Sequence, residues 1–540
     1  MVMPGTISQD PIGLFPKARC IRRRLSLLPL TLLAYNGTVW ANGESLPEGV
    51  SGRQQDKPNI LIILCDDLGY GDLACYGQPY IQTPHIDRLA SEGMLFTQAY
   101  AGSPVSAPSR ASLMTGQHTG HCAIRGNREY WSGEVTYGQN SDYAITGQHP
   151  LDTAHIILPE IMKEAGYHTG QFGKWAGGYE GSESTPDKRG IDEFYGYICQ
   201  YQAHLYYPNF LNRFSRNQGD TAVVREILQD NIQYPMSGTD YRKRTQYSAD
   251  LIHQHALKWI DHQQIGEPFF GLLAYTLPHA ELVQPNDSIV QHYIKQFKED
   301  KDYPGNKGSR YNATQHTHAQ FAAMISRMDC YVGELMHKLE EKGLAENTLV
   351  IFTSDNGPHE EGGADPKFFG RDGKLKGLKR SCHEGGIRIP FIVCWPGHVA
   401  PGSRSEHQLA FWDIMPTLCQ AIGLHDSTSL YKRGTNDHFD GLSFLPTLEG
   451  RPTEQRIHDH LYWEFGETDQ VAVRRGNWKM VVKHGKPFLY DLGNDIHEDH
   501  DLSKSYPGIL QELIRMAHEE HTHAPLFPVT MPTEATERKN

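Results

Sequence analysis

The chain has 540 residues, 38% of them hydrophobic and 21% charged, and its 51 Lys and Arg against 64 Asp and Glu give a net charge of −13. This length exceeds the roughly 250–300 residues at which one hydrophobic core stops growing, so a large domain plus a smaller one is expected and a small disulfide scaffold is excluded. The acidic balance excludes a general nucleic-acid binder, because no excess of cations is available to neutralise phosphates.

The first 41 residues have the features of a secretory signal peptide. Arg22, Arg23 and Arg24 precede an apolar stretch over residues 25–34, and small residues follow up to Ala41. The apolar stretch is about half of the roughly 20 residues that a membrane span needs, so a signal anchor is the less favoured alternative. The sequence predicts export to the periplasm, the outer surface or the medium, with residues 42–57 as a polar linker. No later stretch is long and apolar enough to span a membrane.

The rest of the chain predicts two folded domains. Apolar runs without alternation, typical of strands buried on both faces of a parallel sheet, lie at residues 60–65, 269–275, 349–353 and 391–395. Helical patterns over residues 156–165 and 321–342, each followed by a glycine, lie between them, so residues 58–435 predict a three-layer α/β/α domain with a mostly parallel mixed sheet. Residues 436–540 predict a smaller α+β domain, with short strands at residues 471–474, 479–482 and 488–490 before a last amphipathic helix.

Oxygen-bearing side chains follow two of the predicted strands. Asp66 and Asp67 come after the first strand, and Asp355 and Asn356 come after the strand near residue 349. The carboxyl ends of strands line the ligand crevice of open α/β sheets, so the four side chains are expected to converge. An all-oxygen set with several carboxylates predicts Ca²⁺, with Mg²⁺ less favoured. For either pair alone, a turn or capping role is an equal alternative.

A serine and an arginine lie at the start of a predicted helix. Pro108 is followed by good helix formers, which places Ser106 at the helix mouth, where free N–H groups favour an anion. Arg110 follows one helical turn later, so its guanidinium can reach the same end. A simple N-cap serine is the alternative.

The segment from Ser106 to Gly116 resembles the signature of the sulfatase family, in which a Cys or Ser, then x-Pro-x-Arg and a spacer to Thr-Gly, is oxidised to formylglycine. The resemblance spans nearly the whole mature chain. It extends to Gly173-Lys174-Trp175, Pro278-His279, Asp355-Asn356-Gly357, Lys379 with residues 384–390, and residues 489–492 and 498–502. It implies an alkaline-phosphatase-like fold and, because position 106 is Ser, a bacterial enzyme matured by a serine-oxidising partner enzyme.

The resemblance also implies a role for each matching side chain. Ser106 is the precursor of the nucleophile, whose hydrated aldehyde attacks sulfur in line and whose second hydroxyl lets sulfate leave. The implied ligands of Ca²⁺, acting as a Lewis acid, are Asp66, Asp67, Asp355 and Asn356. The implied cationic wall around the sulfuryl group is Arg110, Lys174, His279 and Lys379. His279 and Lys379 also contact the substrate, and His279 is the favoured acid for the leaving oxygen.

One position departs from the family pattern. The family commonly has a histidine two residues after the lysine of Gly-Lys-Trp, and this chain has Ala176 there. Either another histidine enters the site or a different base acts, and the first is favoured. Residues 200–208 are rich in Tyr, Gln and His, which suits a sugar site, and His204 is the candidate substrate contact. An aromatic loop packed on the core is the alternative for this segment.

These features together predict hydrolysis of a sulfate ester on a carbohydrate. The family resemblance alone suggests galactose or N-acetylgalactosamine sulfate as the first expectation. A phosphodiesterase or phosphonate hydrolase is one alternative, because a tetrahedral anion of similar size would fit the same cations. An inactive glycan-binding homologue is another, because Ala176 replaces the histidine and Ser106 requires modification.

Overall fold

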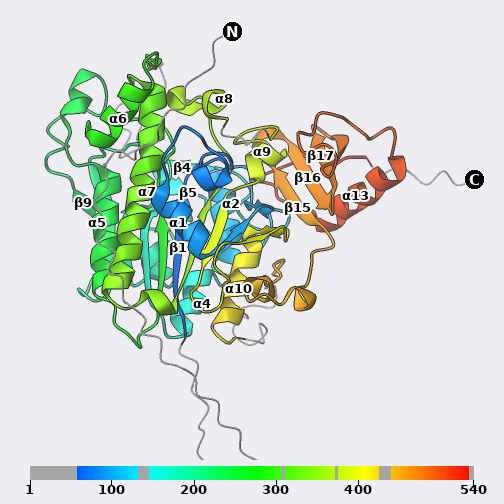
Figure 1. Cartoon of the computed structure of the whole chain (residues 1–540), viewed down its shortest axis with the longest axis horizontal. Coiled ribbons are helices and arrows are strands. Elements are labelled where there is room, and N and C mark those ends of the chain that lie inside the picture. Colours follow the sequence, from blue (N-terminus) through cyan, green and yellow to red (C-terminus); the bar gives the residue numbers. More distant parts are fainter. Residues whose placement is uncertain (1–56, 132–144, 306–310, 371–374, 425–438, 534–540) are drawn as a thin grey trace, which may run out of the picture. The chain divides into compact units, whose positions relative to one another are not determined.

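A ten-stranded mixed sheet forms the middle layer of the structure, a computed structural model that describes residues 57–131, 145–305, 311–370, 375–424 and 439–533 (Figure 1). The strand order is β13-β2-β12-β11-β1-β10-β6-β7-β8-β9, and the strands from β11 to β7 run parallel. Strands β12 and β8 join this parallel part in the antiparallel direction. The strands are β1 (Asn59–Cys65), β2 (Met94–Phe96), β6 (His168–Lys174), β7 (Glu193–Tyr197), β8 (Phe210–Ser215), β9 (Val224–Ile227), β10 (Phe269–Ala274), β11 (Thr348–Ser354), β12 (Phe391–Cys394) and β13 (Ser403–Ser405).

Helices cover both faces of this sheet. Successive residues of β1 alternate between the faces, so Leu61 and Ile63 join one core with α1, α5 and α7, whereas Ile60 and Ile62 join another with α2, α4 and α10. These helices are α1 (Pro84–Glu92), α2 (Ser106–Thr115), α4 (Leu158–Glu164), α5 (Ser248–Asp261), α7 (Thr317–Glu341) and α10 (Ile414–Ala421). Further helices are α6 (Ser288–Gln296), α8 (Pro366–Phe369), α9 (Glu384–Ile387) and α12 (Leu445–Leu448). The short strands β3 (Ala99–Tyr100) and β14 (Leu409–Ala410) pair with each other, as do β4 (Glu129–Trp131) and β5 (Ile145–Gln148).

A four-stranded antiparallel sheet follows near the C-terminus, at the right of Figure 1. Its strands are β15 (Leu461–Phe465), β16 (Gln470–Arg475), β17 (Trp478–Lys483) and β18 (Lys486–Asp491). One face packs on α13 (Pro507–Glu520), and the other packs on Tyr100 and Val105, the residues that lead into α2. The Trp463 indole N–H on that second face donates to the carbonyl of Ala101 at 2.9 Å. The small sheet therefore supports the start of α2.

The predicted fold class is confirmed: a large, mostly parallel mixed sheet lies between helices, and a small antiparallel sheet comes after it. The expectation that residues 391–395 form a parallel strand is wrong, because β12 runs antiparallel to β11. An unbroken apolar run reports burial on both faces, which is typical of parallel strands but does not by itself fix the direction of a strand. Strand β15 was not predicted. The signal peptide over residues 1–41 and the domain boundary after residue 435 lie outside the described residues and stay predictions.

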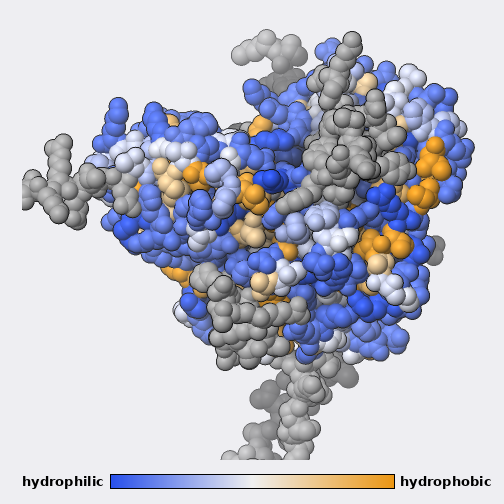
Figure 2. All heavy atoms as spheres, turned by 180° about the vertical axis from the view of Figure 1, so that it is seen from behind, coloured by the Kyte–Doolittle hydropathy of each residue, from blue (hydrophilic) through white to orange (hydrophobic). Residues whose placement is uncertain are grey.

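The polar surface matches the composition. Figure 2 shows one face on which hydrophilic residues predominate and hydrophobic ones form small separate patches. Among the described residues, no helix is long and apolar enough to cross a membrane.

A buried ion cluster joins the small sheet to the rest of the chain. The Lys479 ammonium on β17 lies 2.8 Å from a Glu384 carboxylate oxygen at the start of α9 and 3.3 Å from one of Glu498, and all three side chains are fully buried. A second Glu498 oxygen accepts the backbone N–H of Glu384 at 2.8 Å. Burial acts against ionisation, but Lys479 and His383 hold the pKa of Glu498 below its usual value.

Replacing this lysine is expected to destabilise the protein strongly. In Lys479→Met, two buried carboxylates lose their shared cation, and breaking such a buried pair costs about 3–5 kcal/mol of unfolding free energy. Urea denaturation followed by fluorescence measures the change. Lys483→Met, on the same strand but exposed, is the matched control and is expected to change stability by less than about 0.5 kcal/mol. A loss below about 1 kcal/mol in Lys479→Met would contradict the buried-pair argument.

Candidate active site

Two adjacent parallel strands bring four oxygen-bearing side chains together. Strands β1 and β11 pair in register up to Cys65 and Ser354, so the residues that follow them emerge side by side. The backbone N–H of Asp67 donates to an Asp355 carboxylate oxygen at 3.1 Å, and the Asn356 amide donates to Asp67 at 2.7 Å. Asp66 and the other three side chains are all fully buried. The structure thus brings the predicted metal ligands into one cluster.

Ser106 lies against this cluster. It is the first residue of α2, and the backbone before it, at Val105, is extended. The Ser106 hydroxyl donates to a carboxylate oxygen of Asp66 at 3.0 Å and lies 3.5 Å from the amide oxygen of Asn356. The side chain is buried, so any substrate group that reaches Ser106 leaves bulk water.

Two buried cations line the same cluster. The Lys174 ammonium, at the end of β6, lies 2.7 Å from Asp66. Arg110, one turn along α2 from Ser106, donates a hydrogen bond from Nε to an Asp355 carboxylate oxygen at 2.9 Å, and its Nη2 lies 2.9 Å from the same oxygen as an ion-pair contact. Gly173, directly before Lys174, has a φ of 110°, and a Cβ there would lie 2.0 Å from the carbonyl oxygen of Ala274 on β10. Only glycine fits this position, so the end of β6 that carries Lys174 depends on it.

Lys379 and His279 contact the cluster at Asp67. The Lys379 ammonium lies 2.9 Å from Asp67 and 2.8 Å from Nε2 of His279, and that nitrogen is 3.2 Å from Asp67. Nδ1 of His279 faces the carbonyl of Ala280, which can only accept a hydrogen bond, so Nδ1 carries a proton. In the neutral ring Nε2 is therefore the acceptor that Lys379 meets.

The loop that carries Lys379 is held by close backbone packing. Gly357, directly after Asn356, lies so near Gly385 that a Cβ would stand 2.0 Å from the Gly385 carbonyl oxygen. The Gly357 N–H donates to the carbonyl of Gly386 at 2.9 Å, and Lys379 donates its own N–H to the carbonyl of Pro358 at 2.9 Å. Any larger residue at 357 would push the loop away from the carboxylates.

One of the three carboxylates, Asp355, is not fully compensated by the neighbouring cations. Burial and the nearby Asp66 carboxylate raise the pKa of Asp355 above its usual value, although Arg110 is bound to it. Burial also disfavours the charged form of Asp66, but Lys174, His279 and Arg110 hold its pKa below the usual range. An extra cation would relieve this repulsion. The donor set of three carboxylates and an amide oxygen fits a hard divalent ion such as Ca²⁺.

The histidine neighbours of the site include His204. It ends a short 3₁₀ turn and stacks on the ring of His279, with centroids 3.9 Å apart and planes 7° apart. His359 lies on the same ring with centroids 5.3 Å apart. Ala176 is buried two residues beyond Lys174. The roles of His204 as a substrate contact and of another histidine in place of the one missing at Ala176 stay predictions.

The sequence analysis missed a fourth carboxylate, Glu361. Its oxygens lie 2.6 Å from Arg380, 3.7 Å from His279 and 3.8 Å from Lys379. Burial acts against ionisation, but Lys379 and His279 hold the pKa of Glu361 well below its usual value. The available signal was a His-Glu-Glu run three residues after Asn356, directly downstream of a strand end. We infer that Glu361 is a positioning residue for Lys379 and His279.

Removing the charge of Glu361 is expected to slow turnover without unfolding the protein. Glu361→Gln keeps the shape of the side chain but removes the negative charge that attracts Lys379 and Arg380. Loss of a residue that orients active-site side chains in this way typically lowers activity about 10–100-fold. Steady-state kinetics across pH separates kcat from KM, and thermal melting checks the fold. Glu360→Gln, the exposed neighbour, is the matched control and is expected to keep full activity. Equal kcat values and pH profiles for both variants would contradict the assignment.

Three comparisons with known proteins agree with this geometry. A family model described as Sulfatase matches residues 58–424. The N-acetylgalactosamine-6-sulfatase of Rattus norvegicus is 30% identical, covering 87% of this chain and 79% of that protein. The N-acetylgalactosamine-6-O-sulfatase of Bacteroides thetaiotaomicron is 28% identical, covering 86% and 93% respectively. The crystal structure of Ps i-CgsB in complex with k-i-k-neocarrahexaose is 28% identical with a TM-score of 0.64, covering 88% of this chain and 95% of that one.

Proposed function

Because this chain belongs to the sulfatase family and is a sulfuric ester hydrolase, we propose that it removes sulfate from a carbohydrate with a nucleophile derived from Ser106. One observation carries the proposal: the Ser106 hydroxyl lies 3.0 Å from Asp66, inside a buried cluster of carboxylates and cations. The named relatives act on N-acetylgalactosamine 6-sulfate groups, which supports a galactose or N-acetylgalactosamine sulfate as the substrate.

The proposed site assigns each side chain a task. Asp66, Asp67, Asp355 and Asn356 would hold Ca²⁺, which supplies Lewis acidity to a sulfate oxygen. Ser106, oxidised to formylglycine by a serine-oxidising maturation enzyme, supplies the attacking oxygen in its hydrated form. Arg110 and Lys174 bind and orient the sulfate group and offset the charge that develops on it.

The leaving oxygen needs a proton, and we propose that the pair of His279 and Lys379 supplies it. Nδ1 of His279 is committed to the Ala280 carbonyl, so Nε2 is the nitrogen that can exchange a proton. The Lys379 ammonium lies 2.8 Å from this Nε2 and can exchange a proton with it, and Glu361 keeps both side chains in place. His204, stacked on His279, is proposed as a substrate contact beside this pair.

The substrate proposal is tested with purified protein produced together with a serine-oxidising maturation enzyme. Sulfated galactose and N-acetylgalactosamine mono- and disaccharides are compared with nitrophenyl sulfate, a nitrophenyl phosphodiester and a phosphonate. We expect sulfate release from at least one sugar and little phosphodiester turnover. Faster phosphodiester or phosphonate hydrolysis would show that the relevant anion is phosphorus-based.

Ala176 favours one other function, an inactive glycan-binding homologue. Intact-mass spectrometry of protein from its native host separates the two readings, because formylglycine at 106 lowers the mass by about 2 Da through loss of two hydrogens. An unmodified Ser106 with no sulfate release but measurable binding of sulfated sugars would support the binding protein. Export of the chain by its first 41 residues, to the periplasm or beyond, is proposed for either function.

A further inference from the structure

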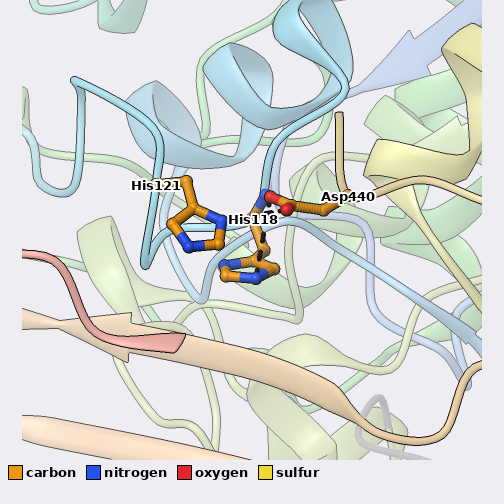
Figure 3. A group of neighbouring side chains, drawn as sticks. All are labelled: His118, His121 and Asp440. Atoms are coloured by element: carbon orange, nitrogen blue, oxygen red, sulfur yellow. Dashed lines mark hydrogen bonds and ion pairs between the residues drawn. The ribbon is translucent and has the colours of Figure 1, made fainter. Parts of the chain in front are cut away.

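A second cluster of metal-ligating side chains lies at the other end of α2. His118 and His121 follow the helix, and Asp440 lies across from them (Figure 3). Glu520, the last residue of α13, also contacts His118. Helix α2 has ten residues at 1.5 Å each, so this cluster lies about 15 Å along the helix from Ser106. It is therefore separate from the carboxylates around Asp66.

The spacing of the potential ligand atoms suits a tetrahedral ion. One atom from each of His118, His121 and Asp440 lies within 4.8 Å of the others. Nε2 of His118 is 3.1 Å from a Glu520 oxygen and 3.6 Å from an Asp440 oxygen, and Nε2 of His121 is 3.8 Å from the same Glu520 oxygen. Zinc bonds of 2.0–2.1 Å in a tetrahedron place neighbouring ligand atoms about 3.4 Å apart. We propose that His118, His121, Asp440 and Glu520 bind a structural zinc ion.

The ligands of this proposed site are held by outer partners. The other carboxylate oxygen of Glu520 lies 3.1 Å from Nε2 of His460, and Asp440 accepts the backbone N–H of His118 at 2.8 Å. Such second contacts orient ligands in protein metal sites. Two imidazoles and two carboxylates match the ligand types that zinc takes, whereas Ca²⁺ prefers oxygen alone.

A metal-free hydrogen-bond network is the competing arrangement of the same side chains. The backbone N–H of Gly120 donates to Nδ1 of His118 at 3.1 Å, so without metal Nε2 carries the proton and donates to Glu520. Zinc on Nε2 moves the proton to Nδ1 and breaks the hydrogen bond from Gly120. Zinc also replaces the hydrogen bond from Nε2 to Glu520. These two bonds are a small loss beside four ligand bonds to a divalent ion.

The ion would tie together three segments that are far apart in the sequence. These are the loop after α2, the segment that contains Asp440, and the end of α13. Zinc would then fix the C-terminal sheet and helix against the helix that starts with Ser106. This role is structural and does not depend on the proposed sulfatase mechanism.

Metal analysis of the full-length protein tests the proposal. After dialysis against metal-free buffer and addition of ZnCl₂, we expect one zinc per chain by mass spectrometry, and a melting temperature about 3 °C higher at a hundredfold excess over Kd. His121→Ala and Glu520→Gln, which keeps the side-chain volume, should lose both effects. His484→Ala, with an exposed histidine side chain, and Asp66→Asn should keep both.

Two outcomes would overturn the proposal. If the wild type binds no zinc above the level of Glu520→Gln, the cluster is the metal-free network. If His484→Ala lowers the zinc content as much as His121→Ala, the bound zinc belongs to surface histidines. Calcium content and sulfatase activity are recorded in parallel, because a failure of the catalytic assignment leaves the zinc result unchanged.

Discussion

Ser106→Ala is expected to abolish sulfate release, with a loss of at least about 10⁴-fold in kcat, as for removal of other catalytic nucleophiles. Alanine offers no hydroxyl to oxidise, so no attacking oxygen can form at this position. The fold should be unaffected, because among the described residues the Ser106 side chain makes one hydrogen bond, to Asp66, and one longer contact, with Asn356. Nitrophenyl sulfate kinetics measures the loss, and circular dichroism and thermal melting check the fold.

A serine on the same helix provides the control. The Ser112 hydroxyl is buried and makes no hydrogen bond within the described part of the chain, so Ser112→Ala is expected to keep activity and mass modification. Ser106→Cys tests whether activity depends on oxidation of residue 106. In a host whose maturation enzyme oxidises only serine, the variant should stay unmodified and inactive. Turnover by Ser106→Ala above one hundredth of the wild-type value would contradict the nucleophile assignment.

Asp66→Asn is expected to remove both Ca²⁺ binding at the active site and activity. The substitution keeps the shape of the side chain but takes one negative charge from the ligand set, and it also removes the ionic partner of Lys174. We expect a fall of about 10²–10³-fold in kcat, the scale of losing one preorganised electrostatic contact in a buried site. Isothermal calorimetry with CaCl₂ should show one site in the wild type and none in the variant.

Chelation provides an independent check of the same site. Wild-type protein treated with EGTA should lose activity and regain it on addition of CaCl₂, whereas Asp66→Asn should respond to neither. Asp87→Asn, on α1, neutralises a half-buried carboxylate away from the cluster and is expected to bind Ca²⁺ normally. Full activity of the wild type after exhaustive chelation would contradict a metal role for Asp66, Asp67, Asp355 and Asn356.

The small C-terminal sheet links stability to the site. Gln470 on β16 accepts the N–H of Cys382 at 3.0 Å and donates to the carbonyl of Arg380 at 3.0 Å. Through these contacts the small sheet holds the loop that carries Lys379. Loss of the Lys479 ion cluster is therefore expected to lower activity as well as stability, because the same loop ends at Glu384.

The sequence by itself determined the parts of the site that follow from local chemistry. Unbroken apolar runs predict buried strands, and residues that directly follow parallel strands share one edge, so Asp66, Asp67, Asp355 and Asn356 were predicted to converge. Pro108 and the residues after it predicted a helix that starts at Ser106. Both inferences need only the residue types near each position.

Only the tertiary structure decided which distant side chains meet. Nothing near Glu361 in the sequence indicates that it approaches His279 and Lys379, and the pairing of His118 with Glu520 joins residues 402 positions apart. The antiparallel direction of β12 could not be predicted from the sequence either, because a hydrophobic run indicates burial and not strand direction. Such contacts depend on the path of the whole chain and on packing between layers, which no local pattern encodes.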